Sequence, residues 1–258
     1  MNLPPGYAAE LVGEATLVAR VSVLAAAREA LAEGTLYDYA AHHPEARPLS
    51  GRGVAYAVAL PYDAANVVIR RSRHGGLLAP MTGELFLAPT RAPRELDVAV
   101  RLGHLGVPTP ELLAYATYPA APLMRRADIA TREVPAAQDL DAALRDTEDD
   151  GRRGELLDAT ATLMRAMTAA GARHPDFNIK NILVTGLADG EPIEALVIDV
   201  DRIWFAEPDS DAVRDANLRR LARSARKRRR DNGTPITETE LKGLADALGA
   251  ALADESAQ

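Results

Sequence analysis

The sequence predicts an α+β protein with a β-rich amino-terminal half and a mainly helical carboxy-terminal half. Short apolar runs between turn residues fill the first half, which is the pattern of β-strands. Longer stretches with apolar residues three and four positions apart fill the second half, which is the pattern of helices. Pro135-Ala136-Ala137 separates the two patterns, so we expect a β-rich lobe over residues 1–134 and a helical lobe over residues 135–258.

Composition supports a soluble protein with a substantial core. The chain has 258 residues, 47% hydrophobic and 26% charged, which is enough for one large domain or two packed lobes. It has no cysteine, which excludes disulfides and thiolate metal sites. The net charge of -7 argues against a surface devoted to nucleic acid. We see neither a signal peptide nor an apolar stretch of the roughly 18 to 20 residues that cross a bilayer, and therefore expect a cytoplasmic protein.

The first half is expected to contain strands with one or two helices. Leu96, Val100 and Leu105 fall on one face of a helix that stops near Gly106. In order, we expect a helix over 21–31, a strand over 54–60, a turn over 62–66, a strand over 67–70, a helix over 94–105, and strands over 112–117 and 127–134.

The second half is expected to be helical around one hairpin. Leu156, Leu163 and Met167 line one side of its longest early helix. In order, we expect helices over 140–146 and 155–170, a polar loop over 171–181, paired strands over 182–185 and 195–198, and helices over 209–230 and 238–252. The hairpin carries most of the polar residues of interest.

The polar loop reads His174-Pro175-Asp176-Phe177-Asn178-Ile179-Lys180-Asn181. Phosphoryl transfer needs a carboxylate that orients or deprotonates the attacking hydroxyl, and oxygen ligands for Mg²⁺. Asp176 suits the first role. Asn181 and Asp199 suit the second, because a tight hairpin brings the end of one strand beside the start of the other. The alternative is that His-x-Asp only caps a helix terminus and Asp199 only ends a strand. The combination favours a bilobal protein-kinase-like fold that uses ATP and Mg²⁺.

A glycine pair stands before the strand at 54–60. Gly51, Arg52 and Gly53 would let backbone N–H groups approach the phosphates of ATP closely. Kinase glycine-rich loops have a third glycine, where this chain has Tyr56. On its own, such a pair before a strand is more often only a turn.

A kinase also needs a cation on the following strand, held by an acid from a nearby helix, to bind the α- and β-phosphates. The chain has no lysine before Lys180, so a lysine cannot fill this place. Arg70 ends the strand at 67–70, and Glu95 begins the next helix. We expect these two to form the pair; the alternative is that both are solvated surface charges.

Together these residues resemble the lipopolysaccharide kinases of Gram-negative bacteria, specifically the 3-deoxy-D-manno-octulosonic acid (Kdo) kinase family. The resemblance covers most of the chain from about Gly51 to Lys227. The segments that carry it are Gly51-Arg52-Gly53, Val68-Ile69-Arg70-Arg71, His74-Gly75-Gly76-Leu77, Thr90-Arg91-Ala92-Pro93-Arg94-Glu95, Gly106-Val107-Pro108-Thr109-Pro110, Arg126-Ala127-Asp128-Ile129, the His174 loop, Ile198-Asp199-Val200-Asp201-Arg202 and Asn217-Leu218-Arg219-Arg220-Leu221. It implies transfer of the γ-phosphate of ATP to a hydroxyl of Kdo on a lipid A precursor, at the cytoplasmic face of the inner membrane.

The resemblance also implies roles for individual residues. Asp176 would be the catalytic carboxylate, Asp199 a metal ligand and Asn181 a second metal contact. Asp201 stands where protein kinases have glycine, and would orient Arg202 or bind the metal. His174 belongs to the catalytic loop, and Lys180 would either reach the γ-phosphate or point outward. Pro175, Lys180 and Val200 depart from the family pattern, which leaves the acceptor less determined than the reaction.

A basic run covers residues 219–230 of an otherwise acidic chain. It contains Arg219, Arg220, Arg223, Arg226, Lys227, Arg228, Arg229 and Arg230. One interpretation is an electrostatic dock for anionic lipid headgroups or for the phosphates of lipid A, giving peripheral membrane contact. A nucleic-acid patch would need interleaved aromatic residues, which are missing. The remaining alternative is a solvated helix face that forms salt bridges with neighbouring acids.

Two other functions remain open from the sequence. One is a kinase of the same fold with a small molecule, another sugar or a protein as acceptor. The other is a pseudokinase-like binding module, because the third glycine and the usual lysine are missing.

Overall fold

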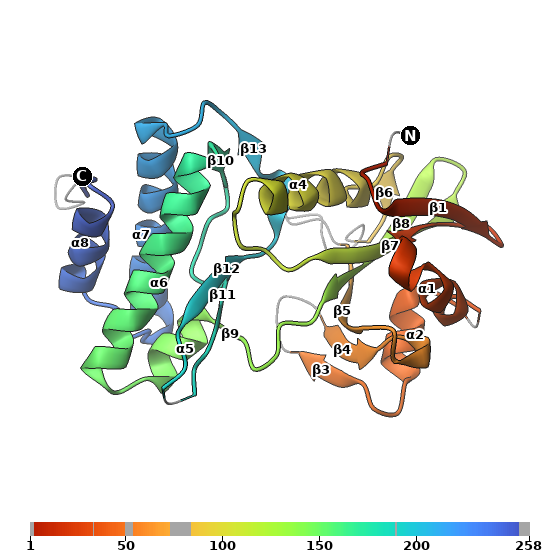
Figure 1. Cartoon of the computed structure of the whole chain (residues 1–258), viewed down its shortest axis with the longest axis horizontal. Coiled ribbons are helices and arrows are strands. Elements are labelled where there is room, and N and C mark those ends of the chain that lie inside the picture. Colours follow the sequence, from red (N-terminus) through yellow and green to blue (C-terminus); the bar gives the residue numbers. More distant parts are fainter. Residues whose placement is uncertain (1–2, 33, 50–53, 73–83, 189, 253–258) are drawn as a thin grey trace. The chain divides into compact units, whose positions relative to one another are not determined.

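The computed structural model describes residues 3–32, 34–49, 54–72, 84–188 and 190–252 (Figure 1). The chain divides into two compact units. The amino-terminal unit contains residues 1–100 and 110–133, and the carboxy-terminal unit contains residues 101–109 and 134–258. The predicted glycine pair, Gly51-Arg52-Gly53, lies outside the described residues.

An antiparallel sheet forms the centre of the amino-terminal unit. Its strand order is β1-β2-β7-β8-β5-β4-β3, and β6 pairs with the first two residues of β8. The strands are β1 Tyr7–Val12, β2 Ala15–Arg20, β3 Arg47–Leu49, β4 Ala55–Ala59, β5 Asn66–Arg71, β6 Phe86–Leu87, β7 Leu112–Ala121 and β8 Met124–Arg132. Strand β5 therefore lies between β4 and β8, so its backbone is held on both sides.

Helices α1 (Leu24–Ala30) and α2 (Leu36–His42) pack against the sheet (Figure 1). The core between them and the sheet includes Val67 and Ile69 of β5, both fully buried. Side chains alternate along a strand, so Arg70 projects from the opposite face of β5. There it meets the first turn of α4 (Ala92–His104). The described part of this unit also contains two 3₁₀ turns, Val21–Val23 and Pro61–Asp63.

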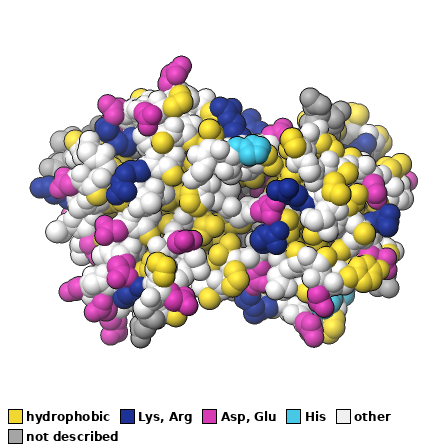
Figure 2. Space-filling view, in the orientation of Figure 1, with side chains coloured by type: hydrophobic (Ala, Val, Ile, Leu, Met, Phe, Trp, Pro, Cys, Tyr) yellow, Lys and Arg dark blue, Asp and Glu magenta, His cyan; other side chains and the backbone are white. Residues whose placement is uncertain are grey.

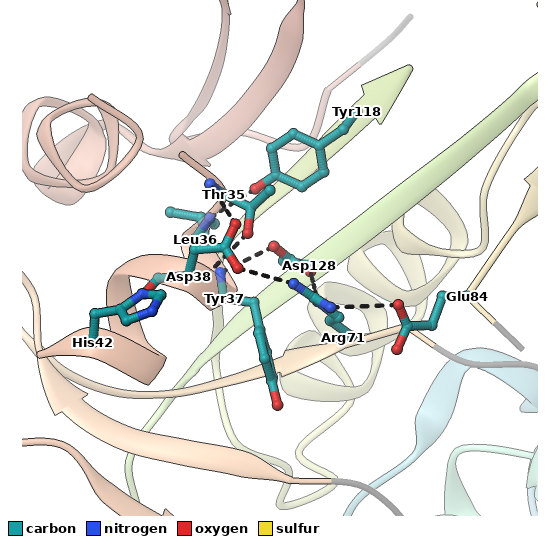
Figure 3. Close-up of polar contacts among 9 residues, drawn as sticks. All are labelled: Thr35, Leu36, Tyr37, Asp38, His42, Arg71, Glu84, Tyr118 and Asp128. Carbon is teal, nitrogen blue, oxygen red and sulfur yellow. Dashed lines mark hydrogen bonds and ion pairs between the residues drawn. The ribbon is translucent and has the colours of Figure 1, made fainter. Parts of the chain in front are cut away.

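Side chains cap the amino terminus of α2 almost completely (Figure 3). Free N–H groups at a helix start destabilise it unless they find acceptors. Here the acceptors are Asp38 for the N–H of Thr35, the Thr35 hydroxyl for the N–H of Asp38, the Tyr118 hydroxyl for the N–H of Leu36 (2.9 Å), and Asp128 for the N–H of Tyr37 (3.0 Å). Two of these acceptors come from β7 and β8, so the caps also attach the helix to the sheet.

Asp128 is the most buried charge in that network. Burial raises the pKa of its carboxyl to about 6, against the opposing effects of the Tyr37 N–H and the Arg71 guanidinium. Arg71 extends from β5 over the ring of Tyr37 and contacts Asp38 at 3.0 Å and Glu84 at 3.4 Å (Figure 3). The face of β5 opposite Arg70 is thus tied to α2.

The carboxy-terminal unit is mainly helical. Its helices are α5 Leu140–Asp146, α6 Asp150–Ala169, α7 Asp211–Asn232 and α8 Glu238–Ala247. Helices α6 and α7 lie side by side (Figure 1), with Leu156, Met164, Leu218 and Leu221 buried. Short antiparallel strands join the helices: β9 Gln138–Asp139, β11 Ile182–Thr185 and β12 Glu194–Val197 form one sheet, and β10 Ala172–Arg173 pairs with β13 Trp204–Phe205.

A glycine lets the chain turn from α6 into β10. Gly171 has φ +65°, and its carbonyl accepts a hydrogen bond from the N–H of Ala206 at 2.9 Å. A Cβ at this position would lie 2.3 Å from the carbonyl oxygen of Ala206. Only glycine combines this backbone conformation with such a close approach. The turn brings the start of the His174 loop to the end of α6.

The surface carries charges of both signs. Basic, acidic and apolar side chains are interspersed over the face drawn in Figure 2. Among the described residues, no helix is both long enough and apolar enough to span a membrane.

Candidate active site

The predicted catalytic loop connects β10 to β11 in the carboxy-terminal unit. Phe177 and Ile179 are fully buried and anchor the loop in the core. The residues between and beside them, Asp176, Asn178 and Lys180, are only partly buried. The apolar anchors therefore hold a row of polar side chains at the surface of the unit.

His174 holds this loop against its neighbours. Its backbone N–H donates to Asn217 Oδ1 of α7 at 3.0 Å, and Asn217 Nδ2 donates to the carbonyl of Ala172 at 2.9 Å. The N–H of Asp176 donates to His174 Nδ1 at 3.3 Å, which assigns the ring proton to Nε2, 3.3 Å from the carbonyl of Ile198. Burial lowers the pKa of His174, so the ring stays neutral and keeps both bonds.

Two asparagines fix the turn that follows Asp176. Asn178 Nδ2 and Asn181 Nδ2 both donate to the carbonyl of Asp176, at 2.7 and 3.1 Å. The carbonyl of Asn181 accepts the N–H of Ile198 at 3.0 Å. Asn181 is therefore bonded to the residue that immediately precedes Asp199, as the predicted hairpin requires.

Asp199 has an unusual backbone conformation. Its φ of 58° and ψ of 46° lie in the left-handed region, and a short 3₁₀ turn, Val200–Arg202, follows it. Aspartate tolerates this region better than most residues, but a strained non-glycine residue is typical of functional sites. The conformation leaves Asp199 exposed at the end of the hairpin, while Val200 is buried behind it.

Two arginines meet the carboxylate of Asp176. Arg202 Nη1 contacts Asp176 Oδ2, and Arg220 Nη2 contacts Oδ1 at 3.0 Å. Arg202 comes from the turn after Asp199, and Arg220 comes from α7, three residues after Asn217. Positions three apart lie on the same side of a helix, so one face of α7 supports both His174 and Asp176.

In the amino-terminal unit, Arg70 and Glu95 form the predicted ion pair. Arg70 Nη2 lies 2.5 Å from Glu95 Oε1, and Glu95 is only 5% exposed. A buried carboxylate needs such a partner, because an unpaired charge in the core is costly. These are therefore not two independent surface charges, and their role toward ATP remains a prediction.

Comparison with known proteins identifies the family. The family model described as "Lipopolysaccharide kinase (Kdo/WaaP) family" matches residues 47–246. The chain belongs to this family. Proteins named 3-deoxy-D-manno-octulosonic acid kinase are similar to it: one from Vibrio cholerae serotype O1 is 30% identical over 182 residues (69% of this chain, 72% of the relative), and one from Xanthomonas oryzae pv. oryzae is 30% identical over 204 residues (77% of each).

A solved structure, "WaaP in complex with acyl carrier protein", has the same fold as this Kdo/WaaP family member. The TM-score is 0.53 at 18% sequence identity, and the match covers 86% of this chain and 85% of the other. The predicted α+β, kinase-like fold is confirmed by this likeness, and membership of a kinase family makes the protein a phosphotransferase.

The donor atoms near the hairpin fit Mg²⁺. Asn181 uses its amide nitrogen on the carbonyl of Asp176, so its amide oxygen is the atom that can face a cation. Asp199 and Asp201 add carboxylate oxygens, the ligands that Mg²⁺ prefers. Within the described part of the chain, no group of three or more His, Cys, Asp and Glu side chains could hold a metal by itself. A few protein oxygens completed by phosphate and water match the usual Mg²⁺ site of a kinase.

Lys180 lies beside α5. Its Nζ is 3.4 Å from Asp139 Oδ2, while Asp139 Oδ1 caps α5 by accepting the N–H of Ala142 at 2.8 Å. The Lys180 side chain is half-buried in this contact. A contact with the γ-phosphate, which the sequence suggested, remains a prediction.

The basic run of this Kdo/WaaP family member divides into two groups on α7. Five of its members face acids: Arg220 contacts Asp176, Arg226 and Arg229 contact Glu238, Arg228 lies 3.9 Å from buried Asp141, and Arg230 lies 3.5 Å from Asp231. Arg219, Arg223 and Lys227 are four residues apart and exposed along one face of the helix. We call these three residues the basic stripe.

Arg220 is the site residue that the sequence did not single out. It appeared only as one of many arginines in the run, and nothing in its immediate neighbours separates it from Arg219. The available signal was its spacing from Asn217, within the segment Asn217-Leu218-Arg219-Arg220-Leu221 that carried part of the family resemblance.

Proposed function

We propose that this protein transfers the γ-phosphate of ATP to a hydroxyl of Kdo carried on a lipid A precursor, in the synthesis of the lipopolysaccharide core. One observation carries the proposal. Asp176 lies on an anchored loop, and its backbone carbonyl accepts a hydrogen bond from Asn181 Nδ2. The carbonyl of Asn181 in turn accepts the N–H of Ile198, the residue that precedes Asp199. This arrangement occurs in a chain whose curated relatives are named for phosphorylation of that sugar acid.

Asp176 acts on the acceptor. It orients the attacking hydroxyl and accepts its proton as the oxygen bonds to the γ-phosphorus. The bond from that phosphorus to the bridging oxygen breaks, and ADP leaves. His174 keeps the loop in place, since its neutral ring bonds the N–H of Asp176 and the carbonyl of Ile198.

The other predicted residues hold the nucleotide. Asn181, Asp199 and Asp201 would hold Mg²⁺, which neutralises charge on the phosphates. Arg70, positioned by Glu95, binds the α- and β-phosphates in place of the usual lysine. Gly51-Arg52-Gly53, which lies outside the described residues, would bind the phosphates as the sequence predicts, and Lys180 would contribute positive charge near the γ-phosphate.

The acceptor is a glycolipid, so the protein works at the cytoplasmic surface of the inner membrane. The basic stripe supports peripheral contact there, because its three cations project from one exposed face of α7. Clustered lysine and arginine side chains are attracted to anionic headgroups by about 1 kcal/mol each.

Mass spectrometry of the acceptor tests the proposal. Purified protein with Mg²⁺, ATP and Kdo-lipid A should add one phosphate group to Kdo. Asp176→Asn should lower kcat by roughly 10²- to 10⁴-fold, the usual contribution of a general base. Asp158→Asn, at an exposed site on α6, is the matched control and should keep wild-type activity. No phosphate on Kdo with the wild type, or full activity in Asp176→Asn, would refute the proposal.

A further inference from the structure

The geometry points to Arg202 and Arg220 as the residues that recognise the carboxylate of a sugar-acid acceptor. The inference rests on the proposed function and names the group by which the acceptor is selected. In the bound state, the acceptor carboxylate replaces Asp176 as a partner of these guanidinium groups, and Asp176 becomes accessible to the hydroxyl that it activates.

Both oxygens of the Asp176 carboxylate are engaged by arginine. Arg202 contacts Oδ2 and Arg220 contacts Oδ1. A guanidinium group bonded to each oxygen stabilises the ionised carboxylate and makes it a weaker base toward the proton of a substrate hydroxyl. Moving a guanidinium group from Asp176 to the acceptor would therefore favour both the approach of the hydroxyl and the transfer of its proton.

The two arginines are accessible to a ligand. The exposed fractions of the Arg202, Arg220 and Asp176 side chains are 54%, 42% and 37%. By contrast, the fractions for Arg153 and Glu240, an ion pair that joins α6 to α8, are 12% and 19%. Arg153 also donates to the carbonyl of Leu144, as expected of a purely structural arginine. Neither Arg202 nor Arg220 is enclosed in this way.

The chemistry of the acceptor matches what a displaced arginine needs. The relatives are named for an octulosonic acid, a sugar that carries a carboxylate on the same molecule as its hydroxyl groups. Guanidinium groups bind carboxylates through paired hydrogen bonds with defined geometry. When the sugar carboxylate binds one of these arginines, the guanidinium group keeps an anionic partner and Asp176 loses its contact with that arginine. A neutral sugar offers no such exchange, so its binding would leave a guanidinium group without an anion.

The test compares two acceptors that differ only in charge. One is Kdo-lipid A with a free carboxyl group on its Kdo, and the other is the same molecule with that group converted to a primary carboxamide. The wild type should prefer the free acid by about 10²-fold or more in kcat/KM, because the carboxamide lacks the negative charge and the second acceptor oxygen that a guanidinium group binds. This comparison needs no variant, so it cannot be confused by misfolding.

Variants then assign the preference to the two arginines. Arg202→Gln and Arg220→Gln should each lower kcat/KM for the acid by about 10-fold or more, change the value for the amide little, and leave the KM for ATP within about threefold. Arg202→Lys and Arg220→Lys keep the charge without the planar fork and should fall between. Arg165→Gln, at an exposed position on α6, is the control and should keep the full preference for the acid.

The outcomes separate this inference from the proposed function. Equal use of acid and amide by the wild type would overturn the inference while the proposed function stands. Equal losses for acid and amide in the variants would also overturn it, because they would show that the arginines only hold Asp176. If the wild type phosphorylates neither acceptor, the proposed function fails and the inference fails with it.

Discussion

The candidate catalytic residue Asp176 depends on neighbours both near it and distant from it in the sequence. Asp176 is a common residue in an exposed loop until Phe177 and Ile179 anchor that loop and Asn178 and Asn181 bind its carbonyl. Each of these contacts joins residues that are close together in the sequence. The contacts that give the carboxylate its environment come instead from Arg202, in the turn after Asp199, and from Arg220 of α7.

At the residue scale, the Arg70–Glu95 pair should behave as one unit. Arg70→Gln and Glu95→Gln should each raise the KM for ATP by roughly 10-fold or more. The first change removes the guanidinium group that would bind the phosphates, and the second removes the carboxylate that orients it. The double variant should be less impaired than the two effects combined, with a coupling of about 0.5–3 kcal/mol. ATP kinetics of the four proteins measure this directly.

The control for that cycle is another ion pair of the same unit. Arg47 and Glu133 are 2.5 Å apart, but the Arg47 side chain is 63% exposed. Arg47→Gln should leave the KM for ATP unchanged. Strictly additive effects of the Arg70 and Glu95 changes would show that the pair does not act together on the nucleotide.

At the element scale, the cap of α2 should make the amino-terminal unit sensitive to pH. In the folded protein the pKa of Asp128 is raised to about 6, from an ordinary value of 3.8, because the carboxyl is buried. Because the pKa of this carboxyl is higher in the folded state, its protonation favours folding. The contribution of the protonated carboxyl to the free energy of unfolding is full below about pH 4 and is lost as pH rises through 6.

The free energy of unfolding of the wild type should therefore fall by about 3 kcal/mol relative to Asp128→Asn between pH 4 and pH 7.5. Denaturant titrations of both proteins at several pH values measure the difference. The comparison isolates this one carboxyl from the others, which titrate in both proteins. A difference that does not change with pH would contradict the burial of Asp128 in the network of Figure 3.

A second prediction at this scale concerns the turn between α6 and β10. Gly171→Ala should lower the free energy of unfolding by about 2–4 kcal/mol, because the new methyl group would meet the carbonyl of Ala206 at 2.3 Å in a backbone with φ +65°. Gly243→Ala is the matched control. Gly243 lies within α8 with open space around its Cβ position, so the same change should stabilise the helix by about 0.5–1 kcal/mol. Thermal or denaturant unfolding that moves both variants in the same direction would contradict this account.

The elements differed in how well local pattern predicted them. Helix α5 has the predicted bounds, 140–146, because an N-cap aspartate and a compact apolar face define it locally. The hairpin of β1 and β2 and the helix α2 were not predicted. Two of the six residues of β1 are alanine and one is glutamate, which weakens its strand signal, and α2 depends on caps from Tyr118 and Asp128 far along the chain.

At the scale of the whole molecule, the basic stripe should control association with membranes. Changing Arg219, Arg223 and Lys227 together to glutamine should weaken binding to vesicles containing anionic lipid by about 10²-fold, at about 1 kcal/mol for each charge. Binding to zwitterionic vesicles should change little, and added salt should reduce the difference. Vesicle co-sedimentation measures all three effects.

The control removes positive charge elsewhere on the carboxy-terminal unit. Arg165→Gln with Lys242→Gln changes exposed cations of α6 and α8 and should affect vesicle binding much less. If this control weakens binding as much per charge as the stripe variant, net charge rather than the stripe determines association.

The sequence by itself predicted the reaction class, which membership of the Kdo/WaaP family confirms, and it proposed the residues that perform the reaction. The spacing from Asp176 to Asn181 and on to Asp199 indicated phosphoryl transfer, and the absence of an early lysine made Arg70 the candidate for the nucleotide-binding cation. Both conclusions rest on local order along the chain, which sequence reports directly. The same order identified the strands and helices that carry these residues.

Only the tertiary structure decided which arginines surround Asp176 and which face solvent. Arg219 and Arg220 are adjacent and chemically identical, and only their direction around the axis of α7 separates their roles. Successive helical residues differ by about 100° around the axis, so packing of α7 directs Arg220 to Asp176 and Arg219 to the exposed face. A linear sequence does not contain that packing, because it arises from contacts among α7, the His174 loop and the turn after Asp199.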